Sequence, residues 1–127
     1  ITSKLITLGT GAPPVTENLF TVTGEVEATV YGFIEAAVTS AGALTLELGV
    51  TGGTSAINAI TAVAQLAINR FWVTTTTAVG SAALPAARLI SAANILHVIR
   101  DFAATAGQIT YYCVWRPVSS DGAVVAA

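Results

Sequence analysis

The clearest pattern in the sequence is a strict alternation of apolar and polar positions over residues 25–36. Small or apolar residues fill every second position. Because successive side chains of a strand point to opposite faces, this alternation predicts a long strand with one buried face. Residues 43–50 repeat the pattern, and 40–42 between them suit a short loop, so we expect the two strands to form a hairpin. The opposite face of the first strand carries Glu25, Glu27, Thr29, Tyr31, Phe33 and Glu35.

Two further strands are predicted in the last third of the chain. Gln108–Arg116 alternates again and places Cys113 on its apolar face, and Pro117 ends it because proline cannot donate to a ladder. Asn94–Phe102 is apolar on both faces, which is typical of a strand covered on both sides. Residues 105–107 are predicted to form the turn between them.

The remaining patterns are weaker. Thr54–Ile68 carries apolar residues at helical spacing after a threonine that can cap a helix, so one short helix is predicted there, with an irregular crossover as the alternative. Gly9–Pro14 is predicted to be a loop because Pro13-Pro14 favours extended backbone, and its two glycines do not complete a nucleotide-binding fingerprint. Shorter strands are predicted at Lys4–Leu8, Leu19–Thr23, Arg70–Thr76 and Arg88–Ser91.

These elements predict an all-β fold. Seven or eight short strands separated by turns are typical of a single β-sandwich, jelly-roll-like or small barrel domain, here with at most one short helix. The domain is expected to span residues 1–127. Extended segments at residues 1–18 and 118–127 are expected at its ends, and we expect the terminal residues 1–10 and 118–127 to reach neighbouring subunits.

The low charge content bears on function rather than on fold. Only 9% of the 127 residues are charged, against roughly 25% in typical soluble domains, and Lys4 is the only lysine. Protein interfaces are depleted in Lys, Glu and Asp, so this composition predicts that other subunits cover much of the surface. A secreted domain with a neutral Thr/Ser/Gly surface is the alternative. Direct nucleic-acid binding is not expected, because five scattered basic residues form no cluster.

Candidate chemistry is sparse. His97 is the only histidine and lies between apolar neighbours, so we interpret it as a core or interface residue rather than a catalytic base. Cys113 is the only cysteine and is interpreted as a buried small hydrophobe. Zinc needs three or four ligands, and one histidine with one cysteine does not supply them, so no metal site is predicted. No cofactor or enzymatic activity is predicted either. Glycines and Asn58 within residues 48–69 argue against a membrane span.

Exposed aromatic residues are the best candidates for binding. Tyr31 and Phe33 share one strand face on a charge-poor domain, which favours an interface anchor over isolated exposed rings. An alternative of equal weight is that both faces of this strand are covered within the monomer. The candidate partners for the glutamates are Arg70, Arg88 and Arg116, from an adjacent strand or subunit. The predicted interface residues are Tyr31, Phe33, Trp72, Tyr112 and Arg116.

Several segments resemble a family of small tailed-bacteriophage virion proteins. They are Lys4–Pro13, Glu17–Gly24, Gly107–Pro117 and Ser119–Gly122, and the resemblance fades between Thr54 and Ala87. It implies a capsid decoration or cement protein of the virion. Such a protein self-associates, often as a trimer, and bridges major capsid protein subunits. The alternative is a tail or head fibre module that binds host glycans through Trp72, Tyr31 or Tyr112.

Overall fold

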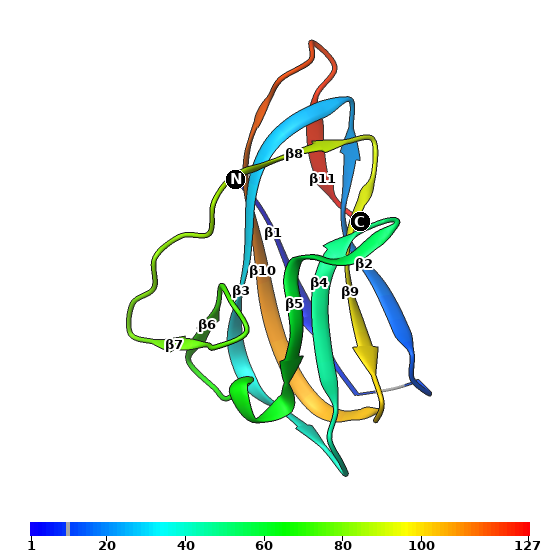
Figure 1. Ribbon diagram of the computed structural model, residues 1–127, viewed down its shortest axis with the longest axis vertical. Coiled ribbons are helices and arrows are strands. Elements are labelled where there is room, and N and C mark those ends of the chain that lie inside the picture. Colours follow the sequence, from blue (N-terminus) through cyan, green and yellow to red (C-terminus); the bar gives the residue numbers. More distant parts are fainter. Residues whose placement is uncertain (10) are drawn as a thin grey trace.

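The computed structural model describes residues 1–9 and 11–127 and shows two antiparallel β-sheets packed face to face (Figure 1). The described residues contain one helical element, the 3₁₀ turn η1 (Val63–Gln65), and no α-helix. The two sheets remain separate rather than closing into a barrel. The prediction of a β-sandwich with at most one short helix is therefore confirmed.

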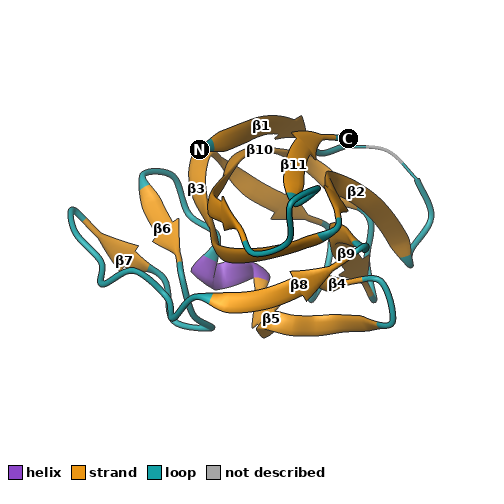
Figure 2. Cartoon of the chain, turned by 90° about the horizontal axis from the view of Figure 1, so that it is seen from above, coloured by secondary structure: helices purple, strands orange, loops and turns teal. Residues whose placement is uncertain are grey.

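Sheet A contains six strands, and sheet B contains five. Figure 2 shows the two layers from above, with β6 and β7 standing out to one side. Sheet A has the order β1 (Thr2–Thr7), β10 (Ala104–Pro117), β3 (Glu25–Ser40), β6 (Arg70–Trp72) and β7 (Ala78–Val79), and β8 (Arg88–Ser91) also pairs with β3. Sheet B has the order β11 (Ala123–Ala126), β2 (Val15–Thr23), β9 (Asn94–Arg100), β4 (Thr45–Val50) and β5 (Gly53–Ala62).

The alternation that predicted the long strands is confirmed. In β3, Val26, Val30 and Ile34 face the core, and in β10 Ile109 and Cys113 do the same. The two strands pair along most of their length and form the centre of sheet A. All residues from 95 to 99 of β9 are buried, as expected for the central strand of sheet B.

The predicted hairpin is wrong. β3 belongs to sheet A, whereas β4 pairs with β9 and β5 in sheet B. β9 and β10 likewise lie in different sheets, and the chain turns at residues 101–103 rather than at 105–107, which lie inside the irregular start of β10. Alternation identifies the buried face of a strand, but any strand with the same period can pair with it, so it does not select the partner.

The predicted helix over Thr54–Ile68 is also wrong, because most of this segment is the edge strand β5. β5 bulges twice against β4, so its register shifts relative to Leu48. The inward-facing positions Asn58 and Thr61 are consequently three residues apart, with Ile60 exposed between them. Bulges therefore gave the strand a spacing that imitates a helix.

The chain ends are strands of the domain rather than free arms. β1 pairs with β10, and β11 pairs with β2. The Lys4 ammonium also donates to the carbonyl oxygens of Asn18 at 2.9 Å and Ala127 at 2.6 Å, and so links the two sheets at this flank. The prediction of extended arms is corrected accordingly, and contact of these segments with neighbouring subunits stays a prediction.

The weaker predictions are partly confirmed. β1, β2 and β8 lie where short strands were expected, but β6 ends at Trp72 because the chain turns away toward β7. In the predicted loop 9–14, the described residues contain no strand, and Thr10 lies outside the described part of the chain.

Candidate functional site

The outer side of sheet A gathers aromatic and aliphatic side chains from four strands. Tyr112 of β10 lies opposite Tyr31 of β3, and their rings stack with centroids 5.3 Å apart. Phe33 lies opposite Phe71 of β6, with ring centroids 5.0 Å apart. All four rings are partly exposed. We call this surface the aromatic face and define it by Leu5, Tyr31, Phe33, Phe71, Tyr112 and Val114.

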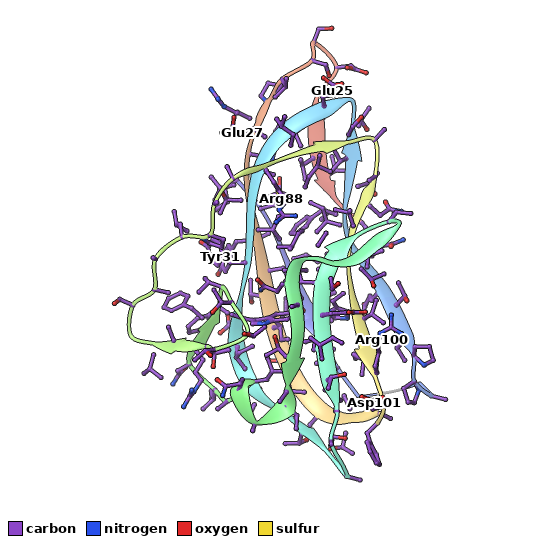
Figure 3. The ribbon with its side chains drawn as sticks, in the orientation of Figure 1. Glu25, Glu27, Tyr31, Arg88, Arg100 and Asp101 are labelled. Atoms are coloured by element: carbon purple, nitrogen blue, oxygen red, sulfur yellow. The ribbon has the colours of Figure 1, made fainter. Side chains whose placement is uncertain are left out.

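Charged residues lie at the border of the aromatic face rather than across it. Arg116 donates to the Glu27 carboxylate at 2.7 Å, and this pairing raises the pKa of the Arg116 guanidinium. The Thr110 hydroxyl donates to Glu35 at 2.8 Å. Exposed pairs of this kind add little to stability. Because these charged groups lie at the border, the centre of the aromatic face holds no ionised group. Figure 3 shows Tyr31 and Glu27 pointing away from the sandwich interior.

Four of the five predicted interface residues meet on this one surface. Tyr31 and Phe33 come from β3, and Tyr112 and Arg116 come from β10. Sequence reasoning missed Phe71, although its position directly before Trp72 places it on the opposite face of the same strand. The interface role of these residues stays a prediction.

The fifth predicted residue, Trp72, is not at the surface. Its side chain is fully buried opposite Gly32. The indole N–H donates to the Thr61 hydroxyl at 3.0 Å. The assignment of Trp72 as an interface anchor or glycan platform is therefore wrong. A three-residue strand is too short for its alternation to reveal which of its faces is buried.

The outer side of sheet B has a different character. β2 presents the exposed polar residues Thr16, Asn18 and Thr21 there. Next to them, the buried Glu47 accepts from Arg100 at 2.8 Å and from the Thr54 hydroxyl at 3.0 Å. The two outer faces of the sandwich thus differ, and only that of sheet A is aromatic.

His97 lies in the core, the first of the two places that the sequence left open for it, and connects the two sheets. Its ring is fully buried, and Nδ1 lies 2.7 Å from the Tyr111 hydroxyl of β10. Burial raises the pKa of Tyr111 well above its usual range, so this hydroxyl keeps its proton. His97 of β9 and Tyr111 of β10 thus join the two sheets through one buried hydrogen bond.

The Nε2 atom of His97 faces the half-exposed carboxylate of Glu17. The two atoms lie 3.4 Å apart, outside hydrogen-bond geometry, and Nε2 has no regular hydrogen bond among the described residues. The short separation still favours the ionised carboxylate. Interaction with His97 lowers the pKa of Glu17, partial burial opposes this shift, and Lys4 adds to it. Sequence reasoning missed this contact, because it depends on the pairing of β2 with β9.

The Glu17 contact predicts a specific pH dependence of stability. The folded-state pKa lies below the unfolded value of about 4.3, so the contribution of Glu17 is complete above that value and is lost as the pH falls through the folded pKa. Glu17→Gln should therefore unfold at lower urea concentration than wild type near neutral pH, and the difference should shrink in acid. Glu35→Gln is the control, because it removes an exposed carboxylate that does not contact His97. An undiminished difference in acid would contradict the assignment.

Cys113 is the buried small hydrophobe that the sequence predicted. Its side chain has no exposed surface, and burial raises the pKa of its thiol to about 11. The thiol therefore stays protonated near neutral pH. Since the thiolate is the reactive form, Cys113 is chemically inert in the folded protein.

The described residues hold no cluster of three or more His, Cys, Asp or Glu placed to bind a metal ion. In the same residues, no helix is long and apolar enough to cross a membrane. Comparison of the chain with protein-family models, curated proteins and solved structures finds no match. The aromatic face is therefore the feature of the described residues that points to a function.

Proposed function

We propose that this protein is a structural protein of a tailed-bacteriophage virion, a capsid decoration or cement protein. It self-associates and bridges major capsid protein subunits, and the aromatic face is its association surface. The observation that carries the proposal is that four of the five residues predicted to anchor an interface gather on one exposed sheet face. The low charge content and the resemblance of both ends of the chain to virion proteins support it.

The aromatic face has the properties of an interface centre. Tyrosine is enriched where interfaces are most deeply buried, whereas Lys, Glu and Asp are depleted there. The rings of Tyr31 and Tyr112 already support each other across the strands, so docking would immobilise few additional rotamers. The pair of Arg116 and Glu27 remains at the border, where charges set orientation more than affinity.

Repetition over a symmetric shell makes such a contact sufficient. A standard interface buries about 1,600 Å². Apolar burial stabilises by roughly 25 cal/mol per Å² before the entropy of association is subtracted. A contact that is modest for one copy is repeated at every equivalent position, and the sum opposes the internal pressure of packaged DNA.

A charge placed in the aromatic face should weaken self-association. Val114 is 42% exposed and lies on the outer side of β10, so Val114→Lys adds an ammonium without emptying the core. Because this charge must be desolvated on docking, self-association should weaken by at least about tenfold. Sedimentation equilibrium measures this, and binding to phage heads prepared without the protein measures capsid attachment.

Val125→Lys is the matched control. Val125 is 57% exposed on β11, opposite Thr21, on the outer side of sheet B. It should associate and bind heads as wild type does. Equal loss in both variants, or a monomeric wild type that does not bind heads, would contradict the proposal. A reconstruction of the particle that places the chain away from the capsid would contradict the cement role.

A fibre module that binds host glycans is the second candidate. The observation that favours it is the partial exposure of the stacked Tyr31 and Tyr112 rings, since aromatic rings can stack on sugars. The burial of Trp72 removes one platform that this function was expected to use. Glycan-array binding by the isolated protein, lost in Tyr112→Ser and kept in Val125→Lys, would favour this function over the cement role.

A further inference from the structure

One edge of sheet A is interrupted. β3 pairs on this side with β8 at residues 25–28 and with β6 at residues 32–33, whereas residues 29–31 have no strand partner there. β6 and β8 both run antiparallel to β3, so they are two pieces of one broken strand beside it. The chain between them leaves the edge and runs out through β7 and a wide loop (Figure 1).

A pocket of about 320 Å³ opens at this gap between the two sheets. Its wall is apolar, and small side chains leave the space free. An apolar cavity of about 150 Å³ admits benzene, so this pocket can hold a phenyl ring. The residues that line it include Ala28 and Val30 of β3, Ile57 of β5, Val73, Leu84 and Arg88.

Arg88 provides a charge at the pocket without a partner for it. It lies opposite Ala28, which faces the core, so its side chain points toward the gap between the sheets. In Figure 3 it lies between β8 and the β4–β5 hairpin. No hydrogen bond or ion pair of Arg88 occurs among the described residues, whereas Arg100 and Arg116 are both paired with glutamates. The pocket therefore suits an apolar group that carries a carboxylate.

The same chain presents such a group at the turn after β9. Phe102 is 45% exposed and directly follows Asp101, and no other acidic residue has a large exposed apolar neighbour in the sequence. The turn is held firmly. The Phe102 N–H donates to the Arg100 carbonyl at 2.9 Å, and the Thr45 hydroxyl donates to the Asp101 carboxylate at 3.3 Å. The Phe102 ring also covers Gly42, which has no side chain to displace it.

We propose that the Asp101–Phe102 turn of one copy docks into the Arg88 pocket of a second copy. The exposed part of the phenyl ring enters the pocket while the rest stays against Gly42, and the Asp101 carboxylate pairs with the Arg88 guanidinium. Arg100 beside the turn does not oppose this pairing, because Glu47 already neutralises it. The contact joins two different surfaces, so it is heterologous and builds a ring if the rotation closes. This inference rests on the self-association in the proposed function and assigns a second contact to it.

Charge exchange tests the contact. Arg88→Glu, Asp101→Arg and Phe102→Ser should each weaken self-association by about tenfold or more in sedimentation equilibrium, because each removes one half of a desolvated contact. The double variant Arg88→Glu/Asp101→Arg restores opposite charges and should recover most of the wild-type affinity. Val118→Ser, 53% exposed and outside both surfaces, is the control and should leave affinity unchanged. Circular dichroism and thermal unfolding confirm that each variant is folded.

The outcomes separate this contact from the proposed function. Weakening by the single exchanges and recovery by the double exchange support it. Weakening without recovery overturns the pairing of Asp101 with Arg88. Unchanged association in Arg88→Glu and Phe102→Ser, with loss in Val114→Lys, overturns the pocket contact and leaves the aromatic face as the association surface. A wild type that is monomeric at high concentration overturns both.

Discussion

Replacing Trp72 with alanine should lower the free energy of unfolding by about 3–5 kcal/mol, the range for deleting a large buried aromatic side chain. Trp72 is fully buried and packs edge-on against Tyr111, with ring centroids 6.2 Å apart. It also bonds to Thr61 of sheet B from its own position in sheet A. The substitution therefore opens a cavity between the sheets at the point where the short strand β6 is anchored.

The second tryptophan is the natural control for this measurement. Trp115 is only partly buried, and its indole donates to the Thr2 hydroxyl at 3.0 Å near the edge of sheet A. Trp115→Ala should cost about half as much or less, because surface and edge substitutions leave smaller cavities. Urea unfolding at neutral pH measures both variants. Equal losses would show that Trp72 does not hold the sheets together as described.

Adding one methyl group at Gly49 should destabilise the protein by about 2–3 kcal/mol, in the upper part of the range for overpacking. A side chain at Gly49 would overlap the backbone of Gly53 and Thr54, and backbone cannot move aside as a flexible side chain can. The start of β5 folds closely over β4 at this point. Gly49→Ala therefore separates the hairpin or shifts β4, whose neighbour Leu48 is in the core.

Gly53→Ala, in the same hairpin, tests this explanation. A side chain there meets the Ala56 and Val50 side chains only at ordinary distances of 3.5 and 3.9 Å. The variant should unfold within about 0.5 kcal/mol of wild type, as most substitutions without a named mechanism do. Thermal unfolding or urea titration of the pair compares them directly. If Gly53→Ala were as damaging as Gly49→Ala, loss of glycine itself rather than the close backbone approach would be responsible.

The functional proposals depend on the rigidity of sheet A. β3 and β10 pair along almost their whole length, and their inward residues, including Val30 and Ile109, are buried. Their outward residues are therefore fixed in position by the same ladder. A surface held in this way loses little entropy on association, which is why stacked Tyr31 and Tyr112 suit an interface.

Much of the candidate surface followed from the sequence. The alternation in 25–36 and 108–116 assigned Tyr31, Phe33, Tyr112 and Arg116 to outward faces, and the structure places them on one side of sheet A. The alternation assigned these faces although it contains no information on which strands are neighbours. Trp72 was misplaced because β6 has only three residues, and the helix predicted at 54–68 failed because bulges in β5 changed the local period.

The sequence by itself determined the all-β class, the buried faces of the long strands and the core position of Cys113. These follow from side-chain direction, which repeats every two residues along a single strand and needs no partner. Only the tertiary structure decided which strands pair, that both chain ends are edge strands, that Glu17 meets His97, and that Arg88 faces a pocket. Such features depend on contacts between residues far apart in the chain, where many partners share the same local pattern and packing of the whole domain selects one.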